Sequence, residues 1–369
     1  MNATTFPRIL LGPGPSGVTP RVLEALGRAP IGYLDPELFH LVDGLRADLR
    51  QVFGTTNPFT LAITGTGMAG MECCLSNVLE PGDPVIVGIH GFFGGRIAEI
   101  CRRLGAEVTE VHAEWGSALD PEQIEAALKP LKRVKLVACV HAETSTGVEQ
   151  PLEAISNLAH EHDALFLVDA VTSLGGIPVE IDKRGIDVCY SGTQKCLGAP
   201  PGLAPITVSE RALEVAARRK TPPPVWYFDW NLLRAYYDEP HAYHHTVPVN
   251  LLFALREALA EIMEEGLDSR FARHRQVSRE LIEGLQQLGI SPFVPESLRL
   301  PMLNTVKLPA GVEDEAGIRR QLLQVYGLEI GGGLGSLKGK IWRIGVMGAS
   351  ATHRNITLLL AALRETLTP

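Results

Sequence analysis

Near the middle of the chain the sequence reads Phe166-Leu167-Val168-Asp169-Ala170-Val171-Thr172-Ser173, an apolar run that ends in a carboxylate. A second run, Tyr190-Ser191-Gly192-Thr193-Gln194-Lys195-Cys196, leads from a strand into small and hydroxyl residues and presents one lysine. Each reads as a buried strand with a reactive side chain at its carboxyl end, where open α/β sheets bind their ligands. The two stretches predict an α/β fold with Asp169 and Lys195, 26 residues apart, at one edge of the sheet.

Outward from these stretches, short apolar runs alternate with helical patterns from about residue 59 to residue 209. Such alternation implies right-handed crossovers and a mostly parallel sheet with helices on both faces. The pattern breaks at Thr221-Pro222-Pro223-Pro224, because a proline run cannot continue a helix. Strands are predicted at 59–63, 84–88, 108–112, 134–141, 164–169, 187–191 and 203–208, and helices at 67–79, 93–104, from Asp120 onward, and at 152–162.

The last third of the chain follows a different pattern. A long helix is predicted from about Val249, with apolar residues at helical spacing, and Gly266 ends it. A smaller α+β unit follows Gly289, with strands predicted at 304–308, 328–330 and 341–346 and helices at 315–325 and 352–367. The layout is a large α/β unit, a long connecting helix and a small C-terminal unit.

The bulk composition is that of an ordinary globular protein, and 369 residues favour two packed domains. The formal net charge of -8 argues against a nucleic-acid or anionic-membrane partner, whose phosphates would repel the chain. No apolar stretch approaches the roughly 18 residues of a membrane helix, and no secretory signal is visible. The six cysteines lack metal-site spacing. We therefore expect no bound metal and a reduced, cytoplasmic location.

Lys195 and Asp169 suggest a specific cofactor chemistry. A lysine amine at a strand end can condense with an aldehyde cofactor to give the Schiff base of pyridoxal-phosphate (PLP) enzymes. A buried carboxylate is costly unless it meets a positive charge, and a protonated pyridine nitrogen supplies one. Taken singly, Lys195 could be an ordinary solvated lysine and Asp169 an N-cap of the next turn. Their positions at successive strand ends favour the cofactor.

The turn Thr64-Gly65-Thr66-Gly67-Met68 joins a strand to a helix and is rich in glycine. Backbone N–H groups at a helix N-terminus, together with a threonine hydroxyl, can bind phosphate. The turn lacks the third glycine of a dinucleotide fingerprint and is not a Walker A sequence. A monophosphate therefore fits it better, although such a turn can also be only a turn.

Taken together, these motifs resemble the class V aminotransferases of PLP fold type I over the whole chain. Within that family the sequence is most similar to the alanine–glyoxylate and serine–pyruvate aminotransferases. The resemblance implies a large PLP-binding domain with a mostly parallel sheet of seven strands and a smaller α+β domain. The matching stretches are Leu11-Gly12-Pro13-Gly14-Pro15, Leu79-Glu80-Pro81-Gly82-Asp83, His141-Ala142-Glu143-Thr144-Ser145-Thr146-Gly147, Ser191-Gly192-Thr193-Gln194-Lys195, Tyr243-His244-His245-Thr246 and Gly332-Gly333-Leu334-Gly335.

The resemblance assigns a cofactor role to each matched position. Lys195 and Asp169 become the catalytic pair. The remaining cofactor residues are implied to be the phosphate turn Thr66, Gly67 and Met68, the ring-stacking Phe93, Thr144 at the phenolic oxygen, Val171 under the ring, and Gln194 near the phosphate. Met68 stands where a close relative has histidine and Phe93 where the family often has tryptophan. A backbone N–H still serves at the first position, and a phenyl ring still stacks at the second.

Two further inferences concern the substrate and the assembly. Arg343, inside an apolar strand, matches the arginine that grips the substrate α-carboxylate through two parallel hydrogen bonds. Tyr243 and Thr246 match residues that reach the phosphate of the neighbouring subunit, which implies a homodimer with shared active sites. We expect residues 1–20 to pack on the partner, 21–250 to form the PLP-binding domain, and 251–369 to form the connecting helix and the small domain.

The implied reaction is a transamination from a small amino acid, alanine or serine, to a small 2-oxo acid, glyoxylate or pyruvate. A cysteine desulfurase is disfavoured because it needs a cysteine in the C-terminal third, and the last cysteine here is Cys196. An aminotransferase for another small substrate, such as an aminophosphonate, and a non-catalytic PLP-binding scaffold stay open as alternatives.

Overall fold

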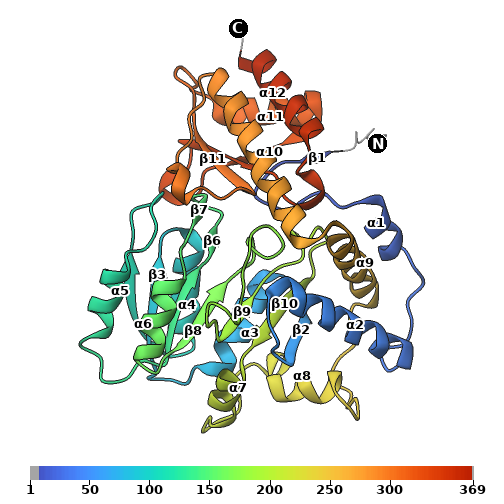
Figure 1. Cartoon of the computed structure of the whole chain (residues 1–369), viewed down its shortest axis with the longest axis vertical. Helices are drawn as coiled ribbons and strands as arrows, with labels where there is room; N and C mark the ends of the chain where they lie inside the picture. Colours follow the sequence, from blue (N-terminus) through green and yellow to red (C-terminus); the bar gives the residue numbers. More distant parts are fainter. Residues whose placement is uncertain (1–7, 368–369) are drawn as a thin grey trace.

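The computed structural model describes residues 8–367. Its centre is a seven-stranded sheet in the order β2-β10-β9-β8-β5-β3-β4 (Figure 1). The strand β10 runs antiparallel to both of its neighbours, and the other adjacent pairs run parallel. The predicted α/β fold with a mostly parallel seven-stranded sheet is confirmed. The strands are β2 (Phe59–Thr64), β3 (Pro84–Ile89), β4 (Glu107–His112), β5 (Leu136–Val140), β8 (Leu165–Asp169), β9 (Val188–Tyr190) and β10 (Leu203–Val208).

Helices follow most of these strands, as the alternating pattern predicted. In β5, β8, β9 and β10 every residue is buried, which explains their continuous apolar runs. A short hairpin of β6 (Ala142–Glu143) and β7 (Val148–Glu149) follows β5. The helices of this unit are α1 (Pro20–Leu26), α2 (Pro36–Phe53), α3 (Gly67–Val78), α4 (Phe92–Arg103), α5 (Pro121–Leu128), α6 (Glu153–Glu161), α7 (Glu210–Ala217), α8 (Trp230–Tyr237) and α9 (Val249–Glu265).

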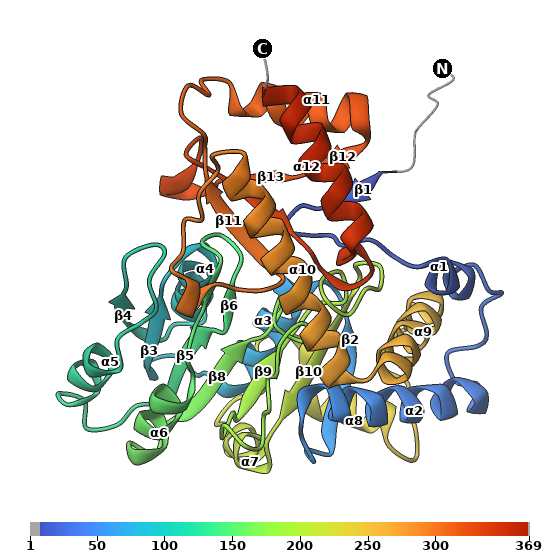
Figure 2. The same ribbon diagram turned by 45° about the horizontal axis from the view of Figure 1, so that its top comes forward.

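A second, smaller unit lies above the seven-stranded sheet (Figure 2). Its three-stranded antiparallel sheet, β11-β14-β13, has its own apolar core with α10, α11 and α12. The strand β1 pairs in parallel with β12, so residues 9–10 pack beside residues 328–329. The elements are β1 (Ile9–Leu10), α10 (Leu267–Gln287), β11 (Leu303–Lys307), α11 (Glu315–Tyr326), β12 (Leu328–Glu329), β13 (Gly331–Gly332), β14 (Ile341–Gly345) and α12 (His353–Leu367), with a short 3-10 helix at Gly348–Ser350.

The helices α9 and α10 connect the two units. Gly266 has φ of 78°, a left-handed backbone conformation that glycine adopts without strain, and α10 begins at the next residue. The predicted end of the long helix at Gly266 is confirmed, whereas the 21-residue α10 was not predicted. The domain boundaries and the partner contact of residues 1–20 stay predictions, and residues 1–7 of that segment lie outside the described residues.

Across residues 8–367, none of the helices has both the length and the apolar character that a membrane span requires.

Candidate active site

One pocket, at the carboxyl ends of the central strands, contains most of the predicted site residues. The predicted residues that line it are Thr66, Gly67, Met68, Phe93, Thr144, Asp169, Val171, Gln194 and Lys195. They come from five separate strand-to-helix or strand-to-loop junctions, which the sheet topology brings to one edge. The sequence did not predict that Met71, Val140, Ala142 and Thr172 also line the pocket.

Lys195 lies in the loop after β9, and the N-terminal segment covers it. Its ammonium donates a hydrogen bond to the carbonyl of Pro13, and its own carbonyl accepts one from Ser16 Oγ at 2.7 Å. Gly14 has φ of 117°, and a Cβ there would come within 2.5 Å of Lys195 Nζ, so only glycine allows this approach. Burial lowers the pKa of Lys195 to about 8. A fraction of the amine is therefore neutral and nucleophilic near neutral pH.

Asp169 is the last residue of β8 and is buried. Its Oδ1 accepts the backbone N–H of Val171 at 2.8 Å, and its Oδ2 accepts the hydroxyl of Tyr190 at 2.8 Å. Burial raises the pKa of Asp169 to about 6, and these two hydrogen bonds oppose the rise. Asp169 forms no ion pair within residues 8–367. A carboxylate in this position can stabilise a cation that enters the pocket.

The N-terminus of α3 forms another wall of the pocket. The N-cap Thr66 makes no side-chain hydrogen bond to the helix, so the first N–H groups of α3 have no cap. A Cβ on Gly67 would lie 2.8 Å from Val171 Cγ2, which shows how closely the helix start approaches that side chain. Gln194 Oε1 is buried without a hydrogen-bond partner in the part of the chain described. Uncapped N–H groups at a helix N-terminus are suited to a phosphate.

Phe93 is held in the pocket by a buried carboxylate that sequence reasoning did not assign a role. Glu143 Oε2 accepts the backbone N–H of Phe93 at 3.0 Å, and its Oε1 accepts both the N–H and the hydroxyl of Ser145. Ser145 Oγ in turn accepts the N–H of Phe92 at 2.9 Å. The start of α4 is therefore capped from the neighbouring β6 hairpin. Burial raises the pKa of Glu143.

Arg343 lies on β14 of the small unit and points toward the β6 hairpin. Its Nε donates to the carbonyl of Gly332 at 2.6 Å and its Nη1 to the carbonyl of Thr144 at 3.3 Å. No hydrogen bond of Nη2 is found among residues 8–367. Burial lowers the pKa of Arg343 to about 10, so the group keeps its charge at neutral pH. A buried cation with a donor to spare can bind a carboxylate.

Tyr243 and Thr246 lie outside this pocket. Both are exposed, and Tyr243, at 60% exposure, stacks obliquely on Tyr33 with ring centroids 5.0 Å apart. Their predicted role in a partner's site therefore stays a prediction.

Comparison with known proteins identifies the family. Residues 29–330 match the family described as Aminotransferase class-V, and the chain belongs to this family. An alanine–glyoxylate aminotransferase from Felis catus is 43% identical over 364 residues, which cover 98% of this chain and 87% of that protein. An (S)-ureidoglycine–glyoxylate transaminase from Bacillus subtilis is 40% identical, with 98% of this chain and 90% of that protein covered. The crystal structure of an alanine–glyoxylate aminotransferase from Nostoc sp. superposes with a TM-score of 0.97 at 44% identity, with 100% and 97% covered.

PLP is the cofactor that this family implies, and the pocket fits it at each functional group. Within residues 8–367 the pocket presents a buried amine, a carboxylate that forms no ion pair, and a helix N-terminus without a side-chain cap. These groups match an aldehyde, a protonated ring nitrogen and a phosphate respectively. The orphaned Gln194 Oε1 marks a further polar position in the same pocket.

Proposed function

We propose that this chain is a PLP-dependent aminotransferase that moves the amino group of a small amino acid, alanine or serine, to a small 2-oxo acid, glyoxylate or pyruvate. The observation that carries the proposal is the convergence of Lys195, Asp169 and Arg343. Lys195 and Asp169 line one pocket, and Arg343 is bonded to the backbone of Thr144, which lines the same pocket. This set supplies an amine, a ring-nitrogen partner and a carboxylate anchor.

Each residue has a defined task in this proposal. Lys195 would hold the cofactor through its amine, and the same amine would take the proton from the substrate Cα. Burial lowers its pKa to about 8, which suits it to accept and return a proton. Asp169 keeps the ring nitrogen protonated. Bound PLP supplies an electron sink for the developing carbanion. Arg343 fixes the substrate carboxylate and thereby sets which Cα bond is cleaved.

Glyoxylate is supported as the acceptor because both relatives from Felis catus and Bacillus subtilis are named as transaminases that use glyoxylate. Their donors differ, so ureidoglycine is a second candidate donor beside alanine. An aminophosphonate remains an alternative donor, and a scaffold that binds PLP without turnover remains an alternative function.

The test is a half-reaction assay on purified enzyme. Single amino acids, including alanine, serine, ureidoglycine and an aminophosphonate, are added without acceptor, and the absorbance of the bound cofactor is followed. We expect fast conversion by alanine or serine, reversed by glyoxylate. Lys195→Ala is expected to abolish conversion while some PLP still binds. Full activity of that variant, or no conversion of wild type by any amino acid, contradicts the proposal.

We further propose a homodimer in which Tyr243 and Thr246 reach the cofactor phosphate of the partner. Both side chains are exposed, and so are the nearby aromatic residues Tyr33, which contacts Tyr243, and Trp226, which stacks on His244. An exposed group of this kind supports a contact with a second subunit. Mixing Lys195→Ala with Thr246→Val should restore activity, because a mixed dimer has one site with both native residues. No gain on mixing would contradict shared sites. The six buried free cysteines are compatible with the predicted cytoplasmic location, which stays a prediction.

A further inference from the structure

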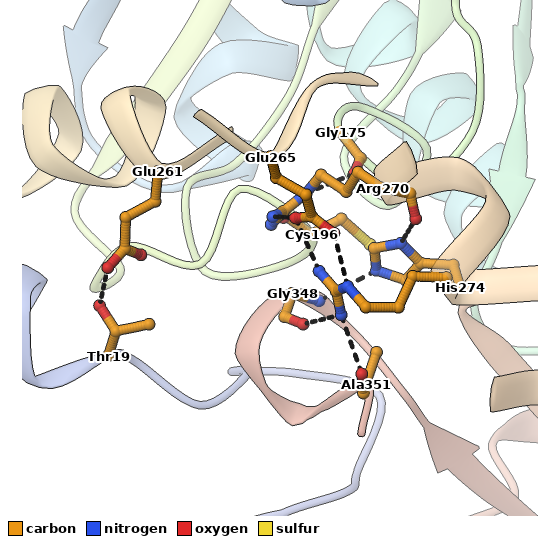
Figure 3. Close-up of polar contacts among 10 residues, drawn as sticks. Thr19, Gly175, Cys196, Glu261, Glu265, Arg270, His274, Gly348 and Ala351 are labelled. Atoms are coloured by element: carbon orange, nitrogen blue, oxygen red, sulfur yellow. Dashed lines mark hydrogen bonds and ion pairs between the residues drawn. The ribbon is translucent and has the colours of Figure 1, made fainter. Parts of the chain in front are cut away.

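A network of charged and polar side chains lies where α9 meets α10, between the two units of the chain (Figure 3). Its members are Glu265, the last residue of α9, and Arg270, Arg273 and His274 on the first two turns of α10. Arg270 and His274 are buried, with exposures of 6% and 0%. Buried charges are costly unless paired and hydrogen-bonded, and here the pairing is dense.

Arg270 faces the large unit. Its Nη2 donates to the carbonyl of Cys196 at 2.6 Å, and its Nε donates to the carbonyl of Gly175 at 3.1 Å. Its Nη1 donates to Glu265 Oε2 at 2.7 Å. Cys196 directly follows Lys195, so Arg270 holds the Cys196–Leu197 peptide, one residue after the reactive lysine.

Arg273 and His274 face the small unit. Arg273 Nη1 donates to the carbonyls of Gly348 and Ala351 at 2.9 and 2.8 Å, and its Nε donates to Glu265 Oε1 at 2.6 Å. His274 Nδ1 lies 2.8 Å from the carbonyl of Arg270, and its Nε2 accepts the N–H of Gly348 at 3.1 Å. Because Nδ1 must donate and Nε2 must accept, this histidine is neutral, consistent with burial lowering its pKa to about 3.

The two halves of the network meet at Gly348. A Cβ there would lie 3.4 Å from the Cys196 carbonyl oxygen and 3.5 Å from Arg270 Nη2. Gly348 follows β14, the strand that carries Arg343, by three residues. The loop after Lys195 and the loop after Arg343 are therefore held against each other through one carboxylate, Glu265, that accepts from both arginines.

We propose that Arg270 is a positioning residue for transamination: through the Cys196 carbonyl it holds the loop that carries Lys195 in register with the segment that follows Arg343. In the same network, Arg273 holds that segment, Gly348 to Ala351, and thereby sets the position of Arg343 relative to the substrate. The inference rests on the proposed function, since it concerns the amine and the carboxylate anchor of that reaction. A network that only held the two units together would not require Arg270 to bond the carbonyl next to Lys195, or Arg273 to bond the segment after β14.

The test compares Arg270→Lys with Arg273→Lys, because lysine keeps the charge but loses the planar fork. Three quantities are measured: the pH midpoint of the bound cofactor's absorbance without substrate, kcat and KM for alanine, and the midpoint of thermal unfolding. We expect Arg270→Lys to shift the absorbance midpoint by about half a pH unit or more and to lower kcat about tenfold. We expect Arg273→Lys to raise KM about fivefold and to leave the absorbance midpoint unchanged.

A matched control lies on α1, which packs against α9. Arg21 pairs with Glu264 at 2.6 Å in an exposed position, near the contact of Thr19 with Glu261 that Figure 3 shows, and it touches neither loop. Arg21→Lys should leave all kinetic and absorbance values unchanged. Changes in thermal midpoint alone for Arg270→Lys and Arg273→Lys, or identical effects of the two, would overturn the inference. Wild-type protein without the cofactor absorbance would instead refute the proposed function.

Discussion

Asp169 and Tyr190 are directly opposite each other on the neighbouring parallel strands β8 and β9, and the Tyr190 hydroxyl donates to Asp169 Oδ2 at 2.8 Å. The same strand pair therefore places the Asp169 carboxylate and supplies one of its two hydrogen bonds. Hydrogen bonds to the charged form of a carboxylate lower its pKa, whereas burial raises it. The balance for Asp169 is a pKa of about 6, close enough to neutrality for one hydrogen bond to matter.

Tyr190→Phe is expected to raise the pKa of Asp169, because it removes a donor to the carboxylate. A protonated carboxyl group does not attract a protonated ring nitrogen. As the pH is lowered, the affinity of the variant for PLP should therefore begin to fall at a higher pH than that of wild type. At pH 7 we expect roughly tenfold weaker binding, the size of one hydrogen bond to a charged group. The measurement is the PLP dissociation constant from pH 5 to 8. Tyr236→Phe removes a hydroxyl that bonds to Tyr33 outside the pocket and should leave the pH profile unchanged.

Lys195→Met should change the stability of the apoprotein in a pH-dependent way. The amine has its ordinary pKa of 10.5 in the unfolded chain and a pKa of about 8 in the fold, because burial disfavours the charge. Between pH 8 and 10.5 the unfolded chain binds more protons, so the stability of wild type rises with pH relative to the variant. The variant should be the more stable at pH 7, with the difference narrowing by on the order of 3 kcal/mol toward pH 10.5. Denaturant unfolding at several pH values tests this, and a constant difference would contradict it.

Arg343→Lys should affect substrate binding rather than cofactor binding. Lysine keeps a positive charge but cannot donate two parallel hydrogen bonds to a carboxylate while also bonding to Gly332 and Thr144. We expect KM for both the amino acid and the 2-oxo acid to rise at least about tenfold, with the PLP dissociation constant within a factor of about three. Steady-state kinetics and a PLP titration measure the two effects. Equal losses in both would indicate that Arg343 holds the pocket together rather than the substrate.

Much of the large unit could be predicted from its sequence because most of its strands are buried on both faces and read as continuous apolar runs. Asp169 and Lys195 could be placed at one edge because parallel strands end together. The direction of β10 was not predicted. This strand follows β9 after a loop and pairs with it antiparallel.

Other features depend on contacts between distant parts of the chain. The helix α10 was missed because its buried face includes Arg270 and His274, which do not read as core residues. Pro13 and Lys195 meet across 182 positions in sequence, and no local pattern indicates that contact. Among the missed lining residues, Met71 lies one turn after Gly67 on α3, and Val140 and Ala142 flank the end of β5. Met71 could have been predicted from its place one helical turn after Gly67, and Val140 and Ala142 from their places at the end of a strand.

Gly91→Ala should disturb the pocket through the cap of α4. Gly91 is extended, with φ of 172°, so alanine suits the backbone there. The added Cβ would, however, lie 2.3 Å from Glu143 Cγ and 2.5 Å from Ser145 Oγ, two buried groups held by hydrogen bonds to each other and to α4. Neither can move without releasing the N–H of Phe92 or Phe93. We expect a loss of about 1–3 kcal/mol in the free energy of unfolding, as for other overpacked sites, together with weaker PLP binding because Phe93 shifts.

Gly95→Ala on the same helix is the matched control for Gly91→Ala. A Cβ at Gly95 would meet nothing within 4 Å, and alanine favours the helix by roughly 0.5–1 kcal/mol over glycine. This variant should therefore be slightly more stable than wild type and should bind PLP equally well. Denaturant unfolding and PLP titration of both variants separate the two cases. If Gly91→Ala lost stability but bound PLP as tightly as Gly95→Ala, the Glu143 cap would support the fold without positioning Phe93.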